Sequence, residues 1–203
     1  MKKIIVDILL LLLMLLEYSK VHLPGEIHEI IGILLIILVI IHLILNRNYL
    51  KAIPKGKYGS KRKALLIVNI SFFIVFGLTT IFGILSNQYL LSSLNIGNLS
   101  IISYHKILAY VCLIILGIHL GFNLEKVFKK IDSKLIYLID AAIILFGAYS
   151  MIQVDFFNHI TGNPGFSQVS GNLLITTLEY LSIILAITII TKLILLAQRD
   201  WTE

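Results

Sequence analysis

The sequence predicts an all-α, polytopic membrane protein with six transmembrane helices. Of its 203 residues, 58% are hydrophobic and only 14% are charged, and the mean hydropathy is +0.96, which lies outside the usual range for soluble domains. Six apolar runs are long enough, or nearly so, to cross about 30 Å of hydrocarbon. The basic residues also gather on alternate loops, as the positive-inside rule expects.

Each run is bounded by residues that interrupt its pattern. The first opens with Lys2 and Lys3, but Asp7 interrupts it and no small-residue cleavage site follows, so we interpret it as a retained helix. Pro24 and Gly25 separate it from the second run. The six runs cover residues 3–22, 27–46, 65–87, 102–124, 135–153 and 173–196.

One membrane domain accounts for the whole chain. Residues 1–125 are expected to form a four-helix core, and residues 126–203 add two further helices. Of the 17 lysines and arginines, all except Lys20 and Lys106 lie on one side if the N-terminus is cytoplasmic, which also places the C-terminus there. The net charge of +6 therefore marks one membrane side. We expect contact with anionic lipid and no nucleic-acid partner.

Two of the predicted helices carry histidines at the same spacing. His28 and His42 are fourteen residues apart, and so are His105 and His119. Fourteen residues of α-helix advance about 21 Å and stop roughly 40° short of four whole turns, so both members of a pair face the same way. The two helices run in the same direction. His28 should therefore lie level with His105 near the outer surface, and His42 level with His119 near the inner one.

Two level histidine pairs predict two bis-imidazole sites, the arrangement by which haem b is held between apolar helices. A lone histidine in a membrane helix is more often a hydrogen-bonded packing residue, but the repeated spacing favours ligation. His22 and His159 lie in outer loops outside this pattern and are expected to be solvated. Glycines allow either a neighbouring helix or a flat cofactor to approach closely. The candidates for this role are Gly32, Gly77, Gly83 and Gly117.

Together, the two H-x13-H helices resemble the four-helix haem core of respiratory cytochrome b over residues 1–125. The segments HEIIG…HLILNR and YHKILAY…GIHLG also resemble an uncharacterised bacterial membrane family grouped with the two-haem cytochromes. The resemblance implies two non-covalent haem b groups and a location in a bacterial inner membrane. It implies axial ligation by His28, His42, His105 and His119. It carries over no quinone site, because no quinol-oxidising loop motif is recognisable.

The function expected is electron transfer across the bilayer. Candidate partners are a quinol or quinone and an extracytoplasmic flavin or iron–sulfur protein. Because no nucleotide-binding fingerprint occurs, an electron-transfer subunit is expected rather than a complete enzyme. The outer loop 153–173, with Phe156, Phe157 and Phe166, is expected to contribute to the partner or quinone site, with Lys106 beside it. The alternatives are a metal-ion permease and a non-catalytic membrane anchor.

For each of three acidic residues in the apolar runs, the sequence supports two interpretations. Glu29 adjoins His28 and either accepts a ring N–H from a histidine or is a solvated residue in the first turn of its helix. Asp7 and Asp140 lie near the inner ends of their helices. They either snorkel to the interface or carry protons, and the structural interpretation is favoured.

Overall fold

The computed structural model describes residues 2–128, 134–163 and 171–200, and this part of the chain contains helices and no strand. The prediction of an all-α fold is therefore confirmed. Short helices join the long ones: η1 (Lys20–His22), α3 (Arg47–Ala52), η2 (Ser92–Leu94) and α7 (Phe156–Ile160). The long helices are α1 (Lys2–Tyr18), α2 (Gly25–Leu45), α4 (Ser60–Leu85), α5 (Leu99–Phe128), α6 (Lys134–Gln153) and α8 (Leu173–Asp200).

Five of the described helices, α2, α4, α5, α6 and α8, are long and apolar enough to cross a membrane. The sixth predicted span, over residues 3–22, is shorter than expected. Helix α1 has 17 residues and ends at Tyr18. The next residue, Ser19, donates its hydroxyl to the carbonyl of Leu15 at 2.9 Å, and η1 follows at once. A hydroxyl that bonds back to its own helix suits a helix end.

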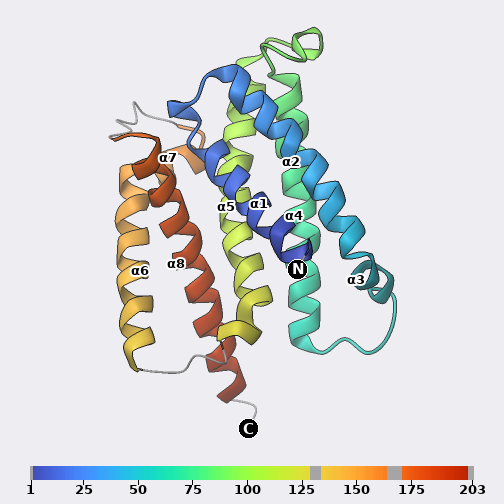
Figure 1. The fold of residues 1–203 in the computed structure, drawn as a ribbon, viewed down its shortest axis with the longest axis vertical. Helices are drawn as coiled ribbons and strands as arrows, with labels where there is room; N and C mark the ends of the chain where they lie inside the picture. Colours follow the sequence, from blue (N-terminus) through green and yellow to red (C-terminus); the bar gives the residue numbers. More distant parts are fainter. Residues whose placement is uncertain (1, 129–133, 164–170, 201–203) are drawn as a thin grey trace.

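Helix α5 lies at the centre of the arrangement, where it packs against α4 on one side and α8 on another. Helix α6 packs on α8, and α1 packs on both α2 and α8. In Figure 1, α4, α5, α6 and α8 run close to the long axis, whereas α1 and α2 cross the view obliquely. The fully buried side chains of Leu113, Ile183 and Ile184 place the core between α5 and α8.

Two glycines of α5 allow α8 to approach closely. A Cβ atom added at Gly117 would lie 2.7 Å from Cβ of Ile187, and one added at Gly121 would lie 2.6 Å from Cβ of Thr191. Close backbone approach at small residues is a common way for membrane helices to associate. For Gly117, this contact supports the helix-packing alternative over a role beside a cofactor.

A buried ion pair joins α6 to α8. Nζ of Lys192 lies 2.7 Å from Oδ2 of Asp140, and both residues are buried. The expectation that Asp140 snorkels is therefore wrong. A buried charge is costly unless it is paired, and the cation from α8 supplies that partner within the protein.

Candidate functional site

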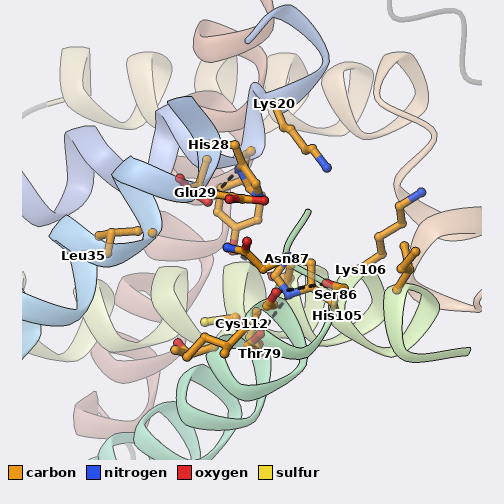
Figure 2. A pocket seen from close by; sticks show the side chains of 18 of the residues that line it. Lys20, His28, Glu29, Leu35, Thr79, Ser86, Asn87, His105, Lys106 and Cys112 are labelled. Atoms are coloured by element: carbon orange, nitrogen blue, oxygen red, sulfur yellow. Dashed lines mark hydrogen bonds and ion pairs between the residues drawn. The ribbon is translucent and has the colours of Figure 1, made fainter. Parts of the chain in front are cut away.

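The outer histidine pair lies in one cavity. The ring centres of His28, on α2, and His105, on α5, are 6.2 Å apart, and their planes meet at 78°. Figure 2 shows both side chains in the cavity, whose volume is about 690 Å³. That volume lies within the range of about 300–1,000 Å³ found for small-molecule and cofactor pockets. The predicted pairing of these two histidines thus agrees with their positions.

The separation of the two rings suits a metal between them. Metal–imidazole bonds are about 2 Å long and a ring centre lies about 1 Å beyond its nitrogen, so an intervening metal places two centres roughly 6 Å apart. The observed separation between the His28 and His105 rings is 6.2 Å.

Both outer rings present Nδ1 to an oxygen atom. Nδ1 of His105 lies 2.8 Å from the backbone carbonyl oxygen of Thr79, which can only accept, so this nitrogen carries the proton. Nδ1 of His28 lies 2.8 Å from Oε2 of Glu17. This is an ion-pair contact without the geometry of a hydrogen bond. Nδ1 of His28 and Oε1 of Glu17 are both buried with no hydrogen-bond partner among the described residues. Within that part of the chain, neither ring has a hydrogen-bond partner at Nε2.

The inner histidines are held in the same way. Nδ1 of His42 donates to Oδ1 of Asp7 at 2.7 Å, and Nδ1 of His119 donates to Oδ1 of Asn69 at 2.9 Å. His42 and Asp7 are more open than the outer contact, with side chains 29% and 50% exposed. The carboxylate of Asp7 thus has a hydrogen-bond role that neither of its sequence-based interpretations included.

An asparagine one turn after each inner histidine lies over its ring. Nδ2 of Asn46 is 3.5 and 3.4 Å from the two ring nitrogens of His42, and Nδ2 of Asn123 is 3.4 Å from both ring nitrogens of His119. Because each asparagine nitrogen is almost equally far from both ring nitrogens, its N–H does not point along the lone pair of either one. Each amide instead donates to the backbone carbonyl of its histidine, at 3.0 and 2.7 Å. Each asparagine therefore bonds most closely to the backbone of its histidine, and its longer contacts reach both ring nitrogens.

Four acceptors thus direct the rings, and the sequence interpretation identified none of them. Helix α1 provides Asp7 and Glu17 for α2, and helix α4 provides Asn69 and Thr79 for α5. In both helices the two acceptors are ten residues apart, from 7 to 17 and from 69 to 79. Thr79 contributes a backbone carbonyl, so its residue type gave no signal. The repeated H-L-x-x-N after each inner histidine was a signal for the neighbouring Asn46 and Asn123.

Glycines beside the histidines differ in their surroundings. A Cβ added at Gly83 would lie 3.0 Å from Cε1 and 3.1 Å from Nδ1 of His105. The missing side chain therefore lets this ring reach the carbonyl of Thr79 one turn earlier on α4. At Gly32 and Gly77 an added Cβ would meet nothing within 4 Å. Gly32 and Gly83 line the cavity.

Glu29 binds a backbone loop, a role that neither expectation included. Its carboxylate accepts the backbone N–H groups of Gln88, Tyr89 and Leu90, with the shortest distances at 2.7 Å. It therefore ties the loop after α4 to the start of α2. The expectation of a histidine partner is wrong, because Glu17 is the acid that contacts His28. The expected solvent-accessible position near the start of α2 agrees with the structure, where the carboxylate also binds this loop.

The two histidines outside the pairs are half-buried, which corrects the expectation that they are solvated. Nε2 of His22 lies 2.9 Å from the hydroxyl of Thr176. The ring of His159 stacks on Tyr110 with centres 4.7 Å apart. Both therefore pack the outer end of the bundle.

The outer loop after α6 is described only in part. Phe156 is 4% exposed and packs against Tyr110, whereas Phe157 is 63% exposed. Residues 164–170, including Phe166, lie outside the described residues. Phe156 therefore belongs to the core, and Phe157 is the phenylalanine of α7 available to a partner.

No group of three or more histidine, cysteine, aspartate or glutamate side chains that could hold a bare metal ion occurs within residues 2–128, 134–163 and 171–200. The described residues instead offer a close pair of imidazoles, those of His28 and His105. Comparison with known proteins finds no matching family, no matching curated protein and no matching solved structure.

Proposed function

We propose that this chain is a di-haem b-type membrane cytochrome that transfers electrons across the bilayer. The observation that carries the proposal is the orientation of the four histidines. Three of them donate Nδ1 to an oxygen on the preceding long helix, and Nδ1 of His28 lies 2.8 Å from a carboxylate oxygen of Glu17 on α1. Histidines that bind metals almost always present their second nitrogen to such an acceptor. A packing histidine needs no such repeated arrangement.

His28 and His105 would hold the outer haem, and His42 and His119 the inner one. Haem b, when bound, supplies an iron that changes between the ferrous and ferric states and so carries one electron. The chain holds the two imidazoles in position and surrounds the outer site with apolar side chains, among them Met14, Leu35 and Phe76. About 21 Å of helix separates His28 from His42 on α2, and the same length separates His105 from His119 on α5.

Two lysines would be able to pair with the propionates of a haem at the outer site. Lys20 and Lys106 both line the cavity. In Figure 2 their ammonium groups extend toward the same side, away from Leu35 at the other end. An ammonium group can pair with a carboxylate at the membrane surface, so we place the propionates there. The electron partner at this face is a quinone or an extracytoplasmic redox protein.

The test is the colour and haem content of the purified protein. We expect a reduced spectrum with bis-histidine haem bands and two haems per chain by the pyridine haemochrome assay. His28→Ala and His42→Ala should each remove one haem and leave the other spectrally intact. His22→Ala is the matched control and should keep both, since this ring contacts Thr176 and lies outside the two pairs.

A colourless preparation that takes up no haem would contradict the proposal. A metal-ion permease would instead bind a divalent ion at the same histidines, and an anchor would bind neither. Loss of both haems in His22→Ala, with the protein still folded, would show that the pairs are assigned wrongly.

A further inference from the structure

The two histidines of each pair have acceptors of different charge. On α2, His28 contacts the carboxylate of Glu17 at 2.8 Å and His42 donates to the carboxylate of Asp7 at 2.7 Å. On α5, His105 and His119 donate to uncharged oxygens at 2.8 and 2.9 Å. Each pair therefore combines one ring beside an acid of α1 with one ring that donates to a neutral group of α4. The contact with Asp7 is a hydrogen bond, whereas the contact with Glu17 is an ion-pair distance without hydrogen-bond geometry.

The outer carboxylate is also incompletely satisfied. Its Oε1 atom is buried without a hydrogen-bond partner among the described residues, and the side chains of Glu17 and His28 are each only 17% exposed. A buried carboxylate is costly unless a positive group compensates it. A ferric centre on the far nitrogen of His28 would be such a group, because charges interact strongly where water is scarce.

Carboxylate and neutral acceptors affect a ligand differently. An anionic acceptor draws the Nδ1 proton more strongly and so raises the electron density, and hence the basicity, at Nε2. A more basic ligand stabilises the ferric state more than the ferrous state. Hydrogen bonding around the axial ligands is one of the means by which a protein sets the potential of a haem.

We propose that Glu17 and Asp7 are positioning residues that orient His28 and His42 and lower the reduction potentials of the two haems. Helix α1, which supplies no ligand itself, then sets the potential of both sites through its two acids. The proposal rests on the proposed function, and it adds a role for a helix that the ligand pattern leaves without one.

The experiment is a redox titration of the haem-loaded protein, followed by optical spectra and low-spin EPR. Glu17→Gln should raise the midpoint potential of the outer haem and leave the inner one in place. Asp7→Asn should raise the inner potential. Asn69→Asp introduces a carboxylate at His119 and should shift the inner potential downward, in the opposite direction to Asp7→Asn at the same site.

Glu26→Gln is the matched control, because Glu26 is an exposed acid two residues before His28. It removes the same charge from the same end of the bundle without touching a ring, so its effect on the outer potential should be much smaller than that of Glu17→Gln. Glu17→Ala should also weaken haem binding by about 10- to 100-fold, as loss of a ligand's hydrogen-bond partner does.

Two outcomes are distinguishable. If the wild-type chain binds no haem, the proposed function and this inference both fail. If it binds two haems but Glu17→Gln shifts the potential no more than Glu26→Gln, or Asn69→Asp raises the inner potential, then only the role of α1 is overturned.

Discussion

At the scale of single residues, the informative atoms are the ring nitrogens. The sequence identifies His28, His42, His105 and His119 by spacing alone, but spacing does not show where a ring points. Orientation depends on acceptors from other helices, such as Thr79, whose contribution is a backbone carbonyl. A backbone acceptor leaves no signature in residue identity, so this part of the site could not be predicted from side-chain chemistry.

Glu29 gives a prediction at this scale. Its carboxylate accepts backbone N–H groups of residues 88–90, and hydrogen bonds to a charged group contribute about 1.5–3 kcal/mol each. Glu29→Ala should therefore increase amide hydrogen exchange at Gln88, Tyr89 and Leu90, with little change in haem content. Glu17→Ala is the comparison, and it should reduce haem content without loosening that loop. Equal haem loss in both variants would contradict these separate roles.

At the scale of helices, five of the six predicted runs correspond to helices long and apolar enough to cross a membrane. Apolar length is enough to locate α2, α4, α5, α6 and α8, because hydrocarbon requires long uninterrupted helices. The end of α1 at Tyr18 was missed, since the apolar run continues past it and the break depends on the local bond of Ser19 to Leu15. The short helices α3 and α7 lie between the predicted runs, where hydropathy alone predicts no helix.

Helix α4 offers a pair of glycines for a controlled comparison. Gly83→Ala places a methyl group 3.0 Å from the His105 ring, whereas Gly77→Ala meets nothing within 4 Å. Both changes favour the helix by up to about 1 kcal/mol. We therefore expect Gly83→Ala to weaken binding of the outer haem, and Gly77→Ala to leave it unchanged. Haem titration of the apoprotein measures this, and equal affinities would contradict the close approach at Gly83.

The contact between α6 and α8 gives a prediction about stability. Asp140→Leu leaves the buried ammonium of Lys192 without this carboxylate, and removing one partner of a buried pair costs about 3–5 kcal/mol. The double variant Asp140→Leu, Lys192→Leu should recover most of that loss, because apolar side chains then face each other. Unfolding in detergent, followed by circular dichroism, compares them. A single variant as stable as the double one would show that the pair contributes little.

At the scale of the whole molecule, the distribution of cations predicts the orientation in the membrane. Residues 47–64 are expected to be cytoplasmic and the loop 86–98 to lie outside. Cysteines at Ser60 and Ser93, both exposed, should differ when intact cells are treated with an impermeant thiol reagent in a Cys112→Ala background. We expect labelling at position 93 only. Labelling at position 60 alone would mean the reverse orientation.

The assembly of the histidine sites has a consequence for chain entropy. Each pair takes one ring from the α1–α2 hairpin and one from the α4–α5 hairpin, and both pairs join residues 77 positions apart, from 28 to 105 and from 42 to 119. A ligand bridging such a pair closes a long loop of the polypeptide, as a disulfide does, and restricts the unfolded chain accordingly. Two such bridges would act as removable cross-links. When the bridging ligand is scarce, the α1–α2 hairpin should separate from the bundle before α6 separates from α8.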